Sequence, residues 1–123
     1  MGRTILVADD STMSRMMIKR ALPEGWAEQV LEAANGQEAL DQLAANAVDV
    51  LFLDLTMPEV DGFAVLEQLS GEGGAMPKTF VISADIQEES LKLCQERGAL
   101  DFVPKPIRAE ALAELLQRHG LLA

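Results

Sequence analysis

The sequence VDVLFLD, at residues 48–54, is a nearly continuous apolar run that ends in a carboxylate. The runs TILVA at Thr4–Ala8 and TFVIS at Thr79–Ser83 are of the same kind, short and nearly free of polar side chains. Strands that are buried on both faces have this composition, because helices cover both faces of a parallel sheet. We therefore predict three central strands here, and two weaker ones at Gln29–Ala33 and Asp101–Val103.

Apolar residues with helical spacing lie between these runs. In the segment Gln37–Asn46 they recur at i, i+3, i+4 and i+7 from Leu40, and the same spacing starts again at Gly62 and at Ala109. Strands that alternate with helices form βαβ units and a parallel sheet covered on both faces. The pattern predicts one α/β domain over residues 1–123, with a doubly wound sheet of five parallel strands and five helices.

Composition excludes several classes of function. The chain has 20 acidic and 10 basic residues, a formal charge of −10, which disfavours non-specific binding to nucleic acid. No apolar run reaches the roughly 18–20 residues of a membrane span, and the first residues do not form a signal peptide. Cys94 is the only cysteine, so no internal disulfide can form, and we expect a cytoplasmic protein.

Polar side chains follow four of the five predicted strands. The first strand runs into Asp9 and Asp10, the third ends at Asp54, the fourth ends at Ser83, and the fifth is followed by Lys105. In open parallel sheets, ligands bind beyond the carboxyl ends of the strands. We therefore expect these side chains to meet at one edge of the sheet.

The charges of this group indicate a metal site. Three neighbouring carboxylates cannot all stay ionised without counter-charge, and Lys105 supplies only one positive charge. All-oxygen ligands suit Mg²⁺, whereas zinc prefers His and Cys, of which the chain has one each. A carboxylate beside Mg²⁺ and a lysine can attack a phosphoryl group, which would form an aspartyl phosphate at Asp54 with Ser83 as a hydrogen-bond donor.

Four motifs in this order resemble the receiver domains of two-component response regulators, specifically the single-domain chemotaxis-type regulators. They are LVADDS at 6–11, LFLDLTMPEVDG at 51–62, VISAD at 81–85 and DFVPKP at 101–106. The resemblance covers essentially the whole chain, and the D-x-x-M-P-x-x-D-G pattern within the second motif is its most specific part. The resemblance to this family, rather than the pattern of residues, implies a flavodoxin-like fold with the strand order 2-1-3-4-5.

The resemblance implies a role for each residue of the site. Asp54 looks like the phosphoacceptor, Asp10 like the direct Mg²⁺ ligand, and Asp9 like its neighbour that acts largely through water. The backbone carbonyl of Thr56 corresponds to the third protein ligand of the metal. Lys105 is similar to the lysine that pairs with the phosphate, and its bond to Pro106 is expected to be cis.

Three further positions are implied to act in switching and in phosphate lifetime. Ser83 matches the switch hydroxyl, and Phe102 stands at the aromatic switch position, where many members have a tyrosine. Since Phe102 has no hydroxyl, it can swing inward but cannot donate a hydrogen bond to a partner. Thr56 and Asp85 match the positions that tune how long the phosphate survives.

The predicted function is therefore phosphoacceptor signalling, not metabolic catalysis. The chain would take its phosphoryl group from a histidine kinase or a histidine phosphotransfer protein, catalyse only its own phosphorylation and dephosphorylation, and as a free-standing monomer bind a downstream protein. The alternative is a phosphatase with an aspartyl-phosphate intermediate, which would place a second Asp two residues after the nucleophile, where this chain has Thr56. A flavin mononucleotide carrier would want a hydroxyl-rich phosphate loop in place of Asp9 and Asp10.

Three methionines lie in the first predicted helix. Met17 belongs to a predicted core stripe with Ile18, whereas Met13 and Met16 lie at the edge of that stripe. Because methionine side chains adapt to many partners, we hypothesise that Met13 and Met16 contact the kinase or phosphotransfer helix. Trp26 is expected to anchor the loop after this helix.

Overall fold

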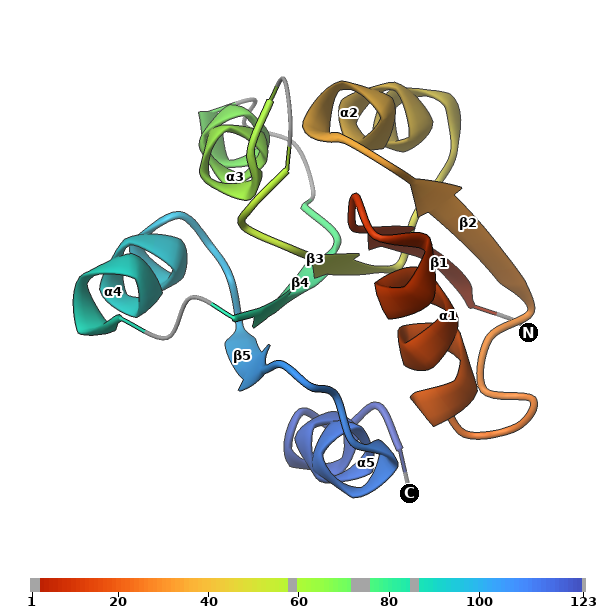
Figure 1. Cartoon of the computed structure of the whole chain (residues 1–123). Helices are drawn as coiled ribbons and strands as arrows, with labels where there is room; N and C mark the ends of the chain where they lie inside the picture. Colours follow the sequence, from red (N-terminus) through yellow and green to blue (C-terminus); the bar gives the residue numbers. More distant parts are fainter. Residues whose placement is uncertain (1–2, 58–59, 72–75, 85–86, 123) are drawn as a thin grey trace.

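The computed structural model describes residues 3–57, 60–71, 76–84 and 87–122. Its strands form one five-stranded sheet in the order β2-β1-β3-β4-β5, in which every neighbouring pair is parallel (Figure 1). The strands are β1 Thr4–Ala8, β2 Gln29–Ala33, β3 Val50–Leu53, β4 Lys78–Ser83 and β5 Asp101–Pro104. The α/β fold class and the strand order implied by the resemblance are both confirmed.

Five helices alternate with these strands along the described chain. They are α1 Thr12–Ala21, α2 Gly36–Ala45, α3 Gly62–Gly71, α4 Glu88–Glu96 and α5 Ala109–Arg118. Helices α1 and α5 cover one face of the sheet, and α2, α3 and α4 cover the other (Figure 1). The sheet is therefore buried on both sides, as the apolar runs predicted.

Successive residues of each central strand enter two separate cores. Ile5 and Val7 pack with Leu112 and Leu116 of α5, whereas Leu6 packs on the opposite face with the α2 and α3 side. All four residues of β3 are buried, which explains why its sequence shows no polar alternation. The continuous apolar run is thus the signature of a strand that contributes to both cores.

Several predicted strand bounds were off by one or two residues, and one predicted core residue was wrong. Strand β3 spans Val50–Leu53 instead of Val48–Asp54, and Asp49 before it donates its N–H to the carbonyl of Thr4 (2.8 Å) and accepts the N–H of Thr4 on its carboxylate (2.8 Å). Met17 is 39% exposed and does not belong to the core. Ile18 alone is fully buried on α1, and Met17 instead lines an open hollow with Pro106 and Ile107.

The loop after α1 is anchored by Trp26, as predicted. Its ring is 6% exposed and lies 6.3 Å from the ring of Phe52 in the core. The indole N–H donates a hydrogen bond to the carbonyl of Leu121 (2.7 Å), and the guanidinium of Arg3 lies 4.8 Å from the ring centroid. Trp26 therefore connects this loop to the beginning and the end of the described chain.

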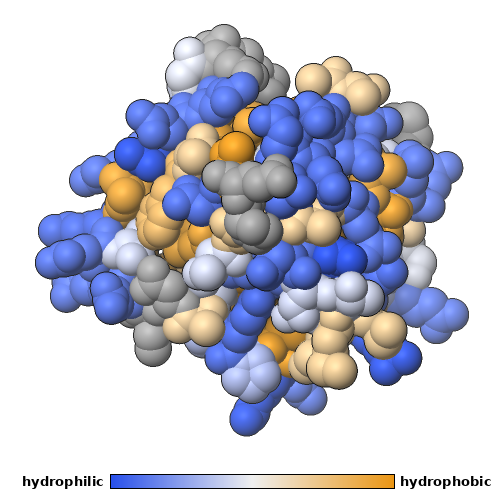
Figure 2. Space-filling view, turned by 45° about the horizontal axis from the view of Figure 1, so that its top comes forward, coloured by the Kyte–Doolittle hydropathy of each residue, from blue (hydrophilic) through white to orange (hydrophobic). Residues whose placement is uncertain are grey.

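Surface composition follows the charge of the sequence. Figure 2 shows one face of the molecule that is mostly hydrophilic, with hydrophobic residues exposed in small groups. None of the described helices is long and apolar enough to cross a membrane.

Candidate functional site

The carboxyl ends of β1, β3 and β5 bring Asp9, Asp54 and Lys105 together. The ammonium of Lys105 lies 2.7 Å from Oδ2 of Asp9 and 3.2 Å from Oδ2 of Asp54. Both carboxylates are buried, at 1% exposure for Asp9 and 5% for Asp54. The convergence predicted from the strand ends is therefore present.

Backbone hydrogen bonds extend past the strands and hold these three residues in place. The N–H of Asp9 donates to the carbonyl of Ala33 (3.0 Å), and the N–H of Asp54 donates to that of Ala8 (2.9 Å). The N–H of Lys105 donates to the carbonyl of Ser83 (3.0 Å), and the Lys105–Pro106 peptide bond is cis, as predicted. The sheet thus fixes the backbone of each charged residue before any ligand arrives.

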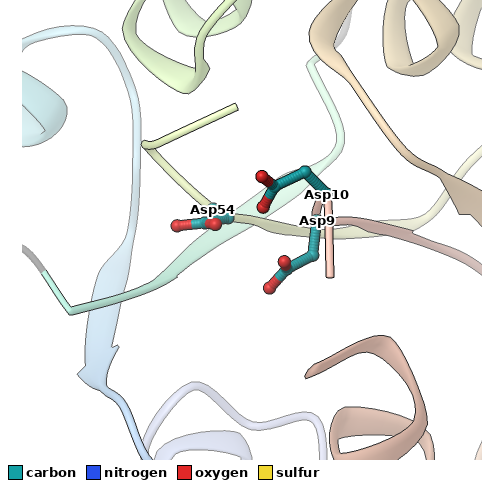
Figure 3. A group of neighbouring side chains, drawn as sticks. All are labelled: Asp9, Asp10 and Asp54. Carbon is teal, nitrogen blue, oxygen red and sulfur yellow. The ribbon is translucent and has the colours of Figure 1, made fainter. Parts of the chain in front are cut away.

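Asp10 completes an acidic cluster at this edge. Asp9, Asp10 and Asp54 each offer one carboxylate oxygen, and these oxygens lie within 4.8 Å of one another (Figure 3). Asp9 and Asp54 are buried, whereas Asp10 is exposed to solvent. A group of this kind, with oxygen ligands and an open side for water, fits a hard divalent cation.

One buried oxygen supports this fit. Oδ2 of Asp9 is in ion-pair contact with Lys105, but no donor among the described residues gives it a well-aligned hydrogen bond. Oδ1 of the same carboxylate accepts from the N–H of Ser11 (2.9 Å). A buried carboxylate oxygen without a directed donor costs free energy, which a bound cation would recover.

The surroundings of Asp54 and of Lys105 raise the pKa of both groups. Burial is the main cause that raises the pKa of Asp54 above its ordinary value, and the charge of Asp9 adds to it, while Lys105 opposes it. Burial alone would lower the pKa of Lys105, but its contact with Asp9 and the charge of Asp54 hold it above its ordinary value. Asp54 is therefore a more basic carboxylate than an exposed one, beside a firmly protonated amine.

The remaining predicted residues lie around this group at different depths. Thr56 is exposed, and its N–H donates to Oδ1 of Asp54 (3.3 Å). Ser83 is buried at the end of β4, and Phe102 is half-buried on the edge strand β5, packed against the core on the α4 side. Asp85 lies outside the described residues.

Sequence reasoning did not predict two contacts that shape the site, one at Gly62 and one at Arg15. A Cβ at Gly62, the first residue of α3, would collide with the carbonyl of Asp54, so this position requires the close approach that only glycine allows. Arg15 of α1 donates a hydrogen bond to the carbonyl of Asp9 (2.6 Å). Neither contact follows from spacing, because each depends on how a helix packs beside a strand end.

Comparison with known proteins decides the family. The family described as the response regulator receiver domain matches residues 5–117 of the chain. The chain belongs to this family. The prediction from the four motifs is confirmed, and a receiver domain is a phosphoacceptor signalling module, which disfavours the phosphatase alternative.

Relatives of the receiver domain include free-standing and longer proteins. The chemotaxis protein CheY of Bacillus subtilis is 33% identical over 118 residues, which cover 96% of this chain and 98% of that protein. The response regulator MprA of Mycobacterium tuberculosis is 38% identical, and the match covers 99% of this chain but 51% of MprA. The structure of Vibrio cholerae CheY4 superposes with a TM-score of 0.85 at 26% identity, covering 96% of this chain and 98% of that one.

Membership of the family gives the acidic cluster its context. Receiver domains bind Mg²⁺ at an acidic pocket, and Asp9, Asp10 and Asp54 form such a pocket in this chain. The family also works with kinase or phosphotransfer partners and with downstream targets. Which of these partners the chain meets depends on its surface.

Proposed function

We propose that Asp54 is the phosphoacceptor of this receiver domain, and that it takes a phosphoryl group from the histidine of a kinase or a phosphotransfer protein. The observation that carries the proposal is the buried carboxylate of Asp54, 3.2 Å from the amine of Lys105 and within the cluster of Asp9 and Asp10. Asp9, Asp10, Asp54 and the backbone carbonyl of Thr56 would hold Mg²⁺. The metal, when bound, neutralises charge on the phosphoryl oxygens.

The chain's own residues supply the rest of the chemistry. A carboxylate oxygen of Asp54 forms a bond to phosphorus while the bond from phosphorus to the donor's imidazole nitrogen breaks, and the electron pair leaves with the imidazole. The desolvated, more basic Asp54 is the better nucleophile for this step. Lys105, protonated and 22% exposed in its side chain, stabilises negative charge on the transferred group.

The signal would leave through Ser83 and Phe102. Ser83 lies at the carboxyl end of β4, the strand between the phosphoacceptor strand β3 and the edge strand β5. We propose that its hydroxyl moves to the phosphoryl group and that the half-buried ring of Phe102 turns inward. A charge-assisted hydrogen bond of this kind contributes about 1.5–3 kcal/mol, part of the roughly 5 kcal/mol that a full switch needs.

Thr56 and Asp85 are the proposed determinants of phosphate lifetime. Thr56 is exposed beside Asp54, so its side chain would border the water that hydrolyses the acyl phosphate. No carboxylate stands at this second position after the nucleophile, so the proton donor of the phosphatase alternative is absent from it. The proposed activity is therefore limited to the chain's own phosphorylation and dephosphorylation.

The α1 surface is the proposed contact for the phosphodonor. Met13 is 71% exposed and Met16 42% exposed, so the hypothesis that they are free to contact a partner agrees with their positions. Met17, on the same helix, lines the hollow that Lys105 and Pro106 also line. An apolar helix of the kinase or phosphotransfer protein that packs here would lie next to the phosphoacceptor site.

Three further expectations stay predictions: a cytoplasmic location, a monomeric state and a free-standing domain that acts through a downstream protein. The match to CheY along its length agrees with the last, whereas the match to half of MprA shows the same domain within a longer regulator. The pathway is open between chemotaxis and other phosphorelays.

The test is phosphorylation by a small donor. The purified protein is incubated with Mg²⁺ and acetyl phosphate, and its intact mass is measured, together with the Asp54→Asn variant and a sample in which EDTA removes the metal. We expect the wild type to gain the mass of one phosphoryl group only when the metal is present, and the variant to gain none. The matched control is Asp41→Asn, an exposed carboxylate on α2, which should be phosphorylated like the wild type. A wild type without mass gain, or an Asp54→Asn variant that gains as much, would overturn the proposal.

A further inference from the structure

Arg15 is an almost buried charge whose guanidinium makes three directed contacts. Its side chain is 14% exposed. Nη1 donates to the backbone carbonyl of Asp9 (2.6 Å), Nε to Oε1 of Glu32 (3.0 Å), and Nη2 to the hydroxyl of Thr12 (3.2 Å). The planar fork of arginine can serve these directions at once, whereas the point charge of a lysine cannot.

The contact with Asp9 fixes a peptide group of the acidic cluster. The N–H of Asp9 is bonded to Ala33 of β2, one carboxylate oxygen accepts from Ser11, and the other contacts Lys105. Arg15 binds the remaining polar group, the carbonyl. That carbonyl belongs to the peptide between Asp9 and Asp10, so its direction sets the plane from which the Asp10 side chain projects toward Asp54 (Figure 3).

Glu32 holds Arg15 from the neighbouring strand. One carboxylate oxygen of Glu32 accepts from Arg15 and the other from Lys19, both at 3.0 Å. The hydrogen bond from Lys19, with a smaller one from Arg15, lowers the pKa of Glu32, so its carboxylate is ionised at neutral pH. The chain of contacts therefore runs from the edge strand β2 through the α1 helix to the turn after β1.

From these contacts we infer that Arg15 is a positioning residue of the phosphorylation site: it locks the Asp9–Asp10 peptide so that both carboxylates are aimed at the metal position beside Asp54, and Glu32 keeps its guanidinium in place. The inference rests on the proposed Mg²⁺ site, which it deepens by naming what holds the ligands. It separates Arg15 from Lys105, which contacts the carboxylates themselves.

A purely electrostatic role for Arg15 makes the opposite prediction. A positive charge close to an acidic cluster repels a divalent cation, so its removal alone would tighten Mg²⁺ binding. Loss of positioning weakens binding instead, because partners that orient metal ligands typically contribute roughly tenfold or more to affinity. The sign of the change therefore tells the two roles apart.

The first experiment measures the Mg²⁺ dissociation constant by isothermal titration calorimetry. We expect Arg15→Lys, which keeps the charge but loses the fork, and Arg15→Met to weaken binding by roughly tenfold, and Glu32→Gln to weaken it less. The matched control is Lys19→Met, which removes the other cation on Glu32 without touching Asp9 and should stay within about twofold of the wild type. Thermal unfolding of each variant confirms that it is folded. Unchanged or tighter binding in both Arg15 variants overturns the inference.

A second experiment needs no metal. Amide hydrogen exchange is followed by NMR in the metal-free protein at Ser11, whose N–H is bonded to the Asp9 carboxylate, with the Asp54 amide in the sheet ladder as reference. Arg15→Lys should speed exchange at Ser11 and leave the reference unchanged. If the wild type binds no Mg²⁺, the proposed metal site is wrong, and the exchange alone then decides the inference: equal exchange in wild type and variant overturns it.

Discussion

The two ends of the sheet surround their carboxylates with different numbers of basic side chains. At the carboxyl end, Asp9 and Asp54 are buried together and share the single amine of Lys105. At the amino end, Asp101 is the first residue of β5, and its one carboxylate receives Arg118 (2.6 Å), His119 (3.0 Å) and the N–H of Phe102 (2.9 Å). At the carboxyl end two buried carboxylates therefore share one cation, whereas at the amino end one carboxylate has two basic side chains and a backbone N–H beside it.

The pKa values follow this difference. Burial is the largest influence on both groups and would raise both. At Asp101 the hydrogen bonds from His119, Phe102 and Arg118 overcome it and hold the pKa below its ordinary value, whereas at Asp54 burial prevails and the pKa is raised. The charge of Asp101 at the amino end therefore stabilises the folded protein at neutral pH, whereas the charge of Asp54 at the carboxyl end destabilises it.

The largest expected effect is at the amino end, in Trp26→Ala. Removal of a buried tryptophan that also donates to the carbonyl of Leu121 should lower the free energy of unfolding by about 3 kcal/mol or more. Urea denaturation followed by circular dichroism measures this. Phosphorylation of the folded fraction by acetyl phosphate should stay normal, because Trp26 is remote from the carboxyl end. A loss below about 1 kcal/mol, or a loss of phosphorylation in folded protein, would contradict the division between the two ends.

A smaller change of opposite sign is expected for Asp54→Asn. The variant replaces a buried charge by a neutral side chain of similar shape and removes the repulsion from Asp9, so the metal-free protein should become more stable by about 1 kcal/mol at neutral pH. The same denaturation experiment measures it, with Asp41→Asn as the control for loss of an exposed carboxylate. Destabilisation by Asp54→Asn would show that the pair with Lys105 outweighs burial.

The smallest effect concerns the response to acid. The folded pKa of Asp101 is below the ordinary value of 3.8, so its stabilisation is present above that pH and is lost as the pH falls through the folded pKa. The folded pKa of Asp54 is above 3.8, so the cost of its charge grows as the pH rises from 3.8 and is complete above that higher pKa. Asp101→Asn should therefore destabilise the protein at neutral pH by about 0.5 kcal/mol, a deficit that disappears in acid.

The pH dependence of stability in both variants, Asp54→Asn and Asp101→Asn, tests the difference between the two carboxylates directly. As the pH falls from neutral toward 3.8, the gain from Asp54→Asn should shrink first, while the deficit of Asp101→Asn should shrink only below 3.8. Unfolding free energies measured across this range decide it. If both differences changed over the same pH interval, the two carboxylates would not differ in the way described.

The sequence was sufficient to predict which residues meet at the strand ends. It was not sufficient to predict contacts between side chains of different elements. Asp9, Asp54 and Lys105 could be placed together because parallel strands deliver their last residues to one edge. Met17 was misplaced because the buried stripe of α1 is narrower than its apolar pattern and reduces to Ile18. Arg15 could not be identified, because its partners lie on a neighbouring strand and on a backbone carbonyl, which no spacing rule specifies.

The amino-end pair shows the same limit. Asp101 and His119 are 18 residues apart, and they meet only because α5 runs antiparallel to the strands and returns its last residue beside the start of β5. Helical periodicity locates the helix, but it does not specify that His119, just after the last turn, contacts Phe80 and Asp101. Contacts of this kind depend on the lengths of two elements and of the loop between them.

The glycine at the start of α3 gives the backbone of Asp54 a fixed support. Because residue 62 has no side chain, the helix approaches until its first turn meets the carbonyl of Asp54, and the N–H of Gly62 donates to the next carbonyl, that of Leu55 (3.0 Å). A single added methyl group would push the helix and the backbone of Asp54 apart. The position of Asp54 therefore depends on a neighbouring residue that contributes neither charge nor side chain.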